Sequence, residues 1–164
     1  MPSLSLSNSL TKARDSKRSQ SIINEPMTLE ASHDDWYSIA DDTLGGAGIG
    51  HHSGGYVTYQ NTTGSDNGYM YKEFLCVPYS TYNHATVSLA TLSGGGAKIW
   101  IGIEKGDDTY SDVSHPSTYT FASGGASKTG DFTVGNVTSF FVSLVTDTNG
   151  SKTYWDSIKI EETG

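Results

Sequence analysis

The sequence is divided into short strand-like runs, and none of them has the length and period of an ordinary helix. The runs are six to eleven residues long, alternate apolar with polar side chains, and end at clusters of Gly, Asn, Asp, Ser or Pro. Gly94-Gly95-Gly96 and Asn149-Gly150 are the clearest of these turn signals. Eight to ten short strands at this spacing predict an all-β sandwich or barrel of antiparallel strands. The 19 Gly and 10 Tyr agree with this class and disfavour a helical bundle or a doubly wound α/β enzyme.

Three runs near the carboxyl end carry the clearest patterns. Residues 98–106 alternate isoleucines at 99, 101 and 103 with more polar positions, which is typical of a strand that faces a core on one side. Residues 139–148 (SFFVSLVTDT) form the most apolar run and are predicted to be a central strand. The alternation in residues 152–162 places Trp155 on the face opposite to Ile158 and Ile160.

Charge separates the first 24 residues from the remainder of the chain. These residues carry a net charge of +3, whereas residues 25–164 contain 6 basic and 17 acidic side chains. The acidic part argues against nucleic acid as a partner, because phosphate binding needs clustered Lys and Arg. No apolar run approaches the roughly 18 residues that a membrane-spanning helix needs, so no membrane partner is expected.

The same division predicts two parts of the chain. Residues 1–25 form an extended basic arm, which is too polar to order by itself and is expected to order on another chain. Residues 26–164 form the β-sandwich domain.

Two stretches of the domain resemble known families. The stretch DDWYSIADDTLGG (34–46) resembles the start of jelly-roll domains related to complex-I intermediate-associated proteins. The stretch SFFVSLVTDTNGSKTYWDSIKI (139–160) is similar to the end of many carbohydrate-binding jelly rolls. Together they imply a galactose-binding-like jelly roll, a fold that hosts many functions.

The stretch LSLSNSLTK (4–12) in the arm is similar to the opening of structural proteins of marine and cyanobacterial phages. This resemblance leads to the first functional hypothesis, a non-enzymatic virion structural protein that decorates or cements the capsid. It would sit at the virion surface in many copies, with capsid or other virion proteins as partners. The residues expected to dock the arm are Leu4, Leu6, Leu10, Arg14, Lys17, Arg18, Ile22 and Ile23.

The alternative hypothesis is a carbohydrate-binding module, either free or on a phage tail. Sugar binding needs exposed aromatic side chains that stack on pyranose rings. Tyr79, Tyr82 and Tyr110 are the candidates for glycan binding, since they lie in loop-like stretches. Trp36 and Trp100 are expected at half-buried edges of the core.

Neither a catalytic residue nor an obligatory cofactor is predicted. Cys76 lies in an apolar run, which is typical of an unreactive core thiol, and the adjacent His51 and His52 would point to opposite faces of a strand. The resemblance to carbohydrate-binding jelly rolls implies a structural Ca²⁺ between the first and last strands, with Glu30 and Asp156 as its ligands.

Overall fold

A computed structural model of the 164-residue chain describes residues 21–26, 36–52, 54–91, 96–106, 113–114, 119–121 and 126–163. All regular elements in these ranges are strands. The strands of the first half are β1 (Ser21–Pro26), β2 (Tyr37–Ser38), β3 (Thr43–Leu44), β4 (Ile49–His52), β5 (Tyr56–Gln60), β6 (Gly68–Leu75) and β7 (Thr81–Thr91). Those of the second half are β8 (Ala97–Gly102), β9 (Val113–Ser114), β10 (Tyr119–Phe121), β11 (Ala126–Val134), β12 (Ser139–Thr146) and β13 (Lys152–Glu162).

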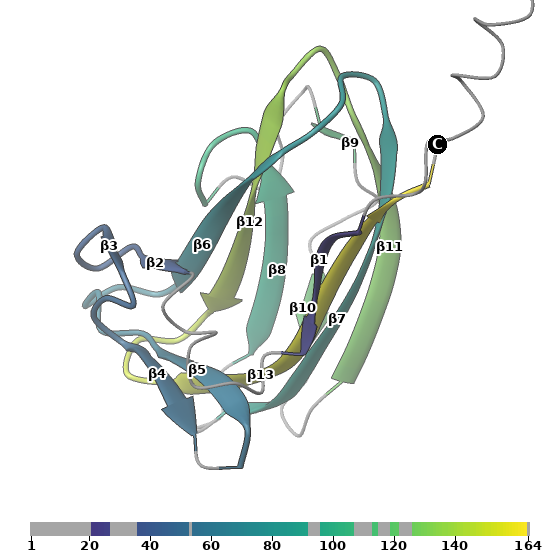
Figure 1. Ribbon diagram of the computed structural model, residues 1–164. Helices are drawn as coiled ribbons and strands as arrows, with labels where there is room; N and C mark the ends of the chain where they lie inside the picture. Colours follow the sequence, from purple (N-terminus) through teal and green to yellow (C-terminus); the bar gives the residue numbers. More distant parts are fainter. Residues whose placement is uncertain are drawn as a thin grey trace, which may run out of the picture.

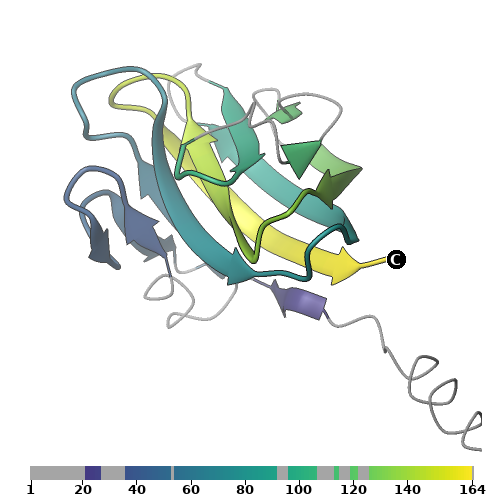
Figure 2. The ribbon, with the colours of Figure 1, turned by 90° about the horizontal axis from the view of Figure 1, so that it is seen from above.

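The strands form two antiparallel sheets that face each other. The seven-stranded sheet has the order β4-β5-β13-β7-β11-β9, and β1 pairs with β13 beside this path. The six-stranded sheet has the order β10-β8-β12-β6-β2-β3. Figure 1 shows β6, β12 and β8 in one layer and β13, β7 and β11 in the other, and Figure 2 shows the same two layers from above. The predicted all-β sandwich is therefore confirmed, with thirteen short strands in the described ranges instead of eight to ten.

Strand β12 is central, as its apolar sequence predicts. It pairs with β6 on one side and with β8 on the other. Phe140, Val142 and Leu144 are fully buried on its inner face. On β8 the predicted alternation is also confirmed, because Ile99 and Ile101 enter the core and Ile103 packs against it.

The core is made by the inner faces of both sheets. The six-stranded sheet contributes Met70 and Phe74 besides the residues of β8 and β12. Tyr59, Tyr82, Phe132 and Trp155 come from the seven-stranded sheet. Aromatic rings from the two layers meet in the middle, where Phe140 of β12 contacts Tyr82 of β7 and Phe132 of β11.

The end of the chain corrects one prediction. Trp155, Ile158 and Ile160 are all buried in the same core, although alternation places Trp155 on the other face. The pairing of β13 with β7 shifts between Trp155 and Ser157, where Asp156 is the extra residue. Such a bulge moves the following side chains by one position. Trp155 and Ile158, three residues apart, can therefore both face the core.

The carboxyl end of the predicted arm is part of the sandwich. Residues 21–26 form β1, and Ile23 pairs with Ile160 of β13. Ile22 and Ile23, which were expected to dock on another chain, thus lie in a strand of this chain's own sheet. The expected boundary at residue 25 falls inside that strand, and residues 1–20 lie outside the described ranges. No helix in the described part of the chain has the length and apolar character needed to cross a membrane.

Candidate functional site

The outer face of the six-stranded sheet carries large aromatic side chains. Tyr37 on β2, Tyr71 on β6, Ser143 on β12 and Trp100 on β8 are register partners from strand to strand. On each strand at least one adjacent residue belongs to the core, so these four residues point away from it. Since adjacent strands lie about 4.8 Å apart, the row extends for about 14 Å across the sheet.

The rings on this face contact one another. Tyr37 and Tyr71 stack with centroids 5.4 Å apart, and Tyr71 lies 6.1 Å from Phe141. Tyr69 continues the series, 6.1 Å from Tyr71 and 6.0 Å from Trp100. We call these five rings the aromatic face; they are Tyr37, Tyr69, Tyr71, Trp100 and Phe141.

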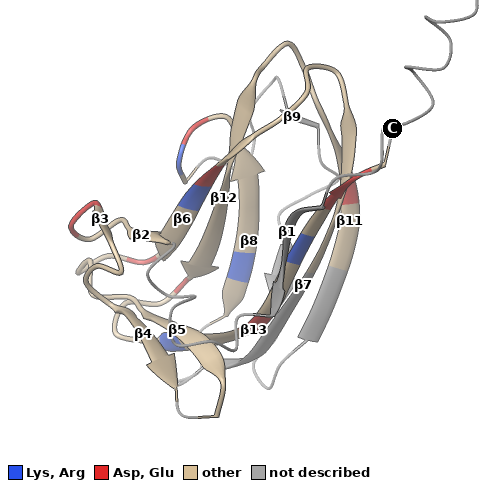
Figure 3. Cartoon of the chain, viewed as in Figure 1, with Lys and Arg blue, Asp and Glu red and all other residues tan. Residues whose placement is uncertain are grey.

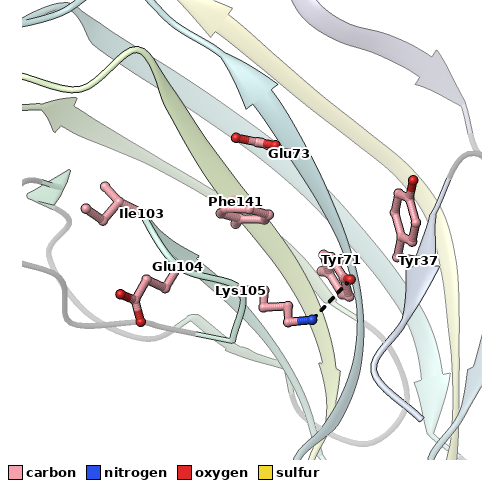
Figure 4. A pocket seen from close by; sticks show the side chains of 7 residues that line it. All are labelled: Tyr37, Tyr71, Glu73, Ile103, Glu104, Lys105 and Phe141. Carbon is pink, nitrogen blue, oxygen red and sulfur yellow. Dashed lines mark hydrogen bonds between the residues drawn. The ribbon is translucent and has the colours of Figure 1, made fainter. Parts of the chain in front are cut away.

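A pocket of about 540 Å³ opens on the aromatic face. Figure 4 shows Phe141 near the middle of its lining residues, with Glu73 on one side of it and Lys105 on the other. The pocket is lined by Tyr37, Tyr71, Glu73, Ile103, Glu104, Lys105 and Phe141. A mostly apolar hollow with a few polar groups at its edge is the usual form of a small-ligand site.

An ion pair closes one end of the pocket. Lys105 Nζ lies 2.9 Å from Asp42 Oδ1, and the Tyr71 hydroxyl donates a hydrogen bond to the same carboxylate. The hydrogen bond from Tyr71, followed by the one from Lys105, lowers the pKa of Asp42. Asp42 belongs to the turn between β2 and β3, and Lys105 follows β8, so the pair joins two loops above Tyr71.

The loop after β8 lies directly on the sheet. The Gly106 N–H donates to Ser143 Oγ at 3.0 Å, and Gly106 has a φ of +73°. A Cβ atom at this position would be 2.5 Å from the Tyr69 hydroxyl oxygen. Glycine is therefore needed both for the backbone conformation and for the close approach that forms this wall of the pocket.

The predicted glycan-binding tyrosines do not meet in one place. Tyr82 is a correction, because it is only 2% exposed and stacks on Phe132 in the core. Its hydroxyl accepts a hydrogen bond from the Val77 N–H, so this tyrosine belongs to β7 and not to a loop. Tyr79 is 71% exposed, in the connection between β6 and β7, and has a φ of +62°. Tyr110 lies outside the described residues.

Other predicted positions have different outcomes. Trp36 is fully enclosed in the core, whereas Trp100 is half-buried on the aromatic face. Cys76 packs against the core, and burial raises the pKa of its thiol, in agreement with an unreactive side chain. Of the two expected calcium ligands, Asp156 is the bulged residue of β13 and Glu30 lies outside the described ranges. The calcium site therefore stays a prediction.

Sequence reasoning missed most of the pocket, although β6 contains a usable signal. In residues 68–75 (GYMYKEFL), Tyr69 and Tyr71 alternate with Met70, so both faces of the strand carry large apolar groups. A strand of an open sandwich ordinarily has one polar face. Aromatic residues on the second face indicate a surface that contacts something other than water.

Comparisons with known proteins identify the fold. No protein-family model matches the sequence, and no curated protein matches it. Among solved structures, the chain is similar to a family 4 carbohydrate-binding module, with a TM-score of 0.58 and 14% identity over 87% of this chain and 97% of that one. It is also similar to the first family 22 module, a xylan-binding domain, of Xyn10C from Paenibacillus barcinonensis. That match has a TM-score of 0.61 and 9% identity over 90% of this chain and 97% of the other.

A third similar structure is a family 61 module in complex with β-1,4-galactotriose, with a TM-score of 0.55 and 10% identity. It covers 88% of this chain and 100% of the other. At these identities the likeness concerns the fold alone, and it confirms the predicted jelly-roll β-sandwich. These three solved structures are carbohydrate-binding modules, and the comparisons give no support to a phage origin.

Proposed function

We propose that the protein is a non-enzymatic carbohydrate-binding module and that the aromatic face of the six-stranded sheet binds the glycan. The observation that carries this proposal is the pocket, in which the exposed ring of Tyr37 and the half-buried ring of Phe141 lie beside carboxylate and ammonium groups. The fold shared with binding modules supports it.

The chemistry of a sugar suits such a surface. A pyranose ring has one face of C–H groups, which packs on an aromatic ring, and a rim of hydroxyls, which need hydrogen-bond partners. Tyr37 is 39% exposed and offers the ring face. Glu73 and Glu104 are exposed at the rim and offer acceptors. The row from Tyr37 to Trp100 is long enough for more than one sugar unit to lie across the strands.

The test is glycan binding by the full chain, first on a glycan array and then by calorimetry with the best ligand. Replacing Tyr37 by alanine should weaken binding by about tenfold or more, because a stacked ring contributes about 1.5 kcal/mol. The melting temperature should change little, since the ring is partly exposed.

The matched control is Tyr154→Ala. Tyr154 is a half-exposed tyrosine of the seven-stranded sheet, where its ring contacts His52 at 5.5 Å. This variant should bind the glycan as the wild type does. Equal weakening by both variants, or no binding of any glycan by the wild type, would contradict the proposal.

The virion hypothesis remains a prediction about residues 1–20 and about location at a virion surface. Co-sedimentation of the full chain and of a chain without residues 1–20 with candidate virions tests it. Binding that needs the arm would place the glycan site on a particle. If the full chain does not sediment with virions, the virion hypothesis is wrong, and only the carbohydrate-binding hypothesis is left.

A further inference from the structure

The pocket combines aromatic walls with an excess of negative charge. Of its seven lining residues, three carry a charge at neutral pH, namely Glu73, Glu104 and Lys105. Lys105 is already paired with Asp42 at 2.9 Å. Within the described part of the chain, neither Glu73 nor Glu104 has an ion-pair partner. Among the described residues, the two carboxylates therefore give the pocket lining an excess of negative charge.

The two carboxylates come from different elements and reach the same hollow. Glu73 lies near the end of β6, where it is the register partner of Phe141, and Glu104 lies in the loop after β8. Figure 4 shows them on different sides of the Phe141 ring. Figure 3 shows a red segment at the end of β6 and another in this loop, each beside a blue segment. A ligand that stacks on Phe141 would thus have a carboxylate on more than one side.

The walls suit a cation as well as a sugar ring. Lys105 Nζ lies 5.1 Å from the centroid of the Tyr71 ring, so the pocket already holds an ammonium group over an aromatic face. Such a contact is attractive because the ring face is negative. Tyr37 and Phe141 provide further rings in the same hollow.

We infer that this pocket takes a sugar unit with a free ammonium group, that is, an amino sugar without its acetyl group within a glycan. The inference rests on the proposed function and names its ligand class. An ammonium group on the sugar would pair with Glu73 or with Glu104, depending on the side of Phe141 to which it points, while the C–H face of the ring packs on aromatic side chains. A uronate or sulfated sugar would place a further negative charge beside the two carboxylates and would be repelled. The net charge of −8 for the whole chain adds to that repulsion.

The experiment compares three oligosaccharides of one length and one β-1,4 linkage, which differ at carbon 2 of each sugar. They are oligomers of glucose, of N-acetylglucosamine and of glucosamine. Calorimetry with the full chain at about pH 6, below the usual pKa of an amine, measures the three affinities under one condition. Because exposed ion pairs contribute up to about 1 kcal/mol each, the glucosamine oligomer should bind about fivefold to tenfold more tightly than the glucose oligomer.

Three controls separate the pocket from the general acidity of the chain. The preference for glucosamine should disappear in a Glu73→Gln, Glu104→Gln double variant. It should persist in Glu161→Gln, which removes a carboxylate of the seven-stranded sheet. Raising the salt concentration from about 0.01 M to about 1 M should also abolish it, since screening shortens the range of charge interactions.

The outcomes distinguish this inference from the proposed function. If glucose or N-acetylglucosamine oligomers bind, lose affinity in Tyr37→Ala and equal or exceed the glucosamine oligomer, the inference fails and the proposed function stands. A preference for glucosamine that survives the double variant overturns the inference as well. If none of the three oligomers binds, the inference fails, and the glycan array then decides the proposed function.

Discussion

The two outer faces of the sandwich differ in chemistry, although the same alternation of side chains builds both sheets. On the seven-stranded sheet, short polar side chains satisfy one another across neighbouring strands. Asn83 Nδ2 donates to Asp131 Oδ1 at 2.8 Å, and the Thr81 and Thr133 hydroxyls lie 3.1 Å apart. On the six-stranded sheet the corresponding positions of the central strands hold the aromatic face.

This difference concerns the paired strands β7 and β11, whereas His52, Tyr56 and Tyr154 form a smaller group of ring contacts on β4, β5 and β13 of the same sheet. A polar outer face with paired side chains is the ordinary outside of an antiparallel sheet. Of the five rings in contact, Tyr37 is exposed, Tyr71 is buried and the other three are half-buried, and a pocket opens beside them. Apolar area left open in this way is typical of a surface that binds a ligand.

The largest effect is expected from Tyr82→Ala. Tyr82 stacks on Phe132 with centroids 5.6 Å apart and lies equally far from Phe140 of the other sheet. Removing its ring should lower the free energy of unfolding by about 3–5 kcal/mol, because the core cannot close the cavity. Urea denaturation measures this. Tyr79→Ala, at a 71% exposed position, should change stability by no more than about 0.5 kcal/mol. Similar values for the two variants would contradict the burial of Tyr82 in the core and the exposure of Tyr79.

A smaller effect is expected from Gly106→Ala, which tests how the loop after β8 rests on the aromatic face. The new Cβ atom would meet the Tyr69 hydroxyl in addition to straining a backbone of positive φ. The matched control is Gly64→Ala, where φ is +79° and nothing lies within 4 Å. The control should lose about 1 kcal/mol from backbone strain alone. Gly106→Ala should lose more and should also weaken glycan binding, and equal losses with normal binding would contradict the described position of the loop.

The smallest effect concerns pH and the ion pair above Tyr71. The pKa of Asp42 is lowered from 3.8, mainly by the hydrogen bond from Tyr71 and then by Lys105. A depressed native pKa means that the stabilising contacts of Asp42 are present above pH 3.8 and are lost as the pH falls through the native value. Tyr71→Phe should therefore raise the pKa of Asp42 towards 3.8, and by more than Lys105→Met does. Carboxyl carbon chemical shifts in an NMR titration measure it. A wild-type Asp42 that titrates at 3.8 or above would show that the contact is absent in solution.

Much of the fold could be predicted from local patterns. The isoleucines of residues 98–106 and the apolar run of residues 139–148 predicted an inner face and a central strand, because alternation with a period of two reports which side of a strand is buried. Alternation does not predict the buried face beyond Asp156, because the bulge there shifts the following side chains by one position. No residue type in the sequence marks this bulge. The prediction for Tyr82 was wrong for a related reason: residues 79–82 look like a loop from composition, and only pairing with β11 and β13 makes Tyr82 part of a strand.

The candidate site was less predictable, because its residues are far apart in the chain. Tyr37, Tyr71, Lys105 and Phe141 come from four segments that only sheet pairing brings together. Among the aromatic residues, the sequence does not separate a core position such as Tyr59 from a surface position such as Tyr69, since both lie in strands with similar neighbours. Exposure separates them, because Tyr59 is fully enclosed and Tyr69 is half-buried. Desolvation raises the pKa of both hydroxyls, that of Tyr59 to about 12.

By itself, the sequence determined that the chain forms short antiparallel strands with turns at Gly, Asn and Pro, and that charge divides its basic start from its acidic remainder. These properties are local, because they depend on the backbone preferences and charges of neighbouring residues. The tertiary structure alone decided which aromatic side chains fill the core, which form the aromatic face, and where Asp42 meets Lys105. Those outcomes depend on the register between distant strands, and a shift of one residue in that register exchanges the two faces of a strand.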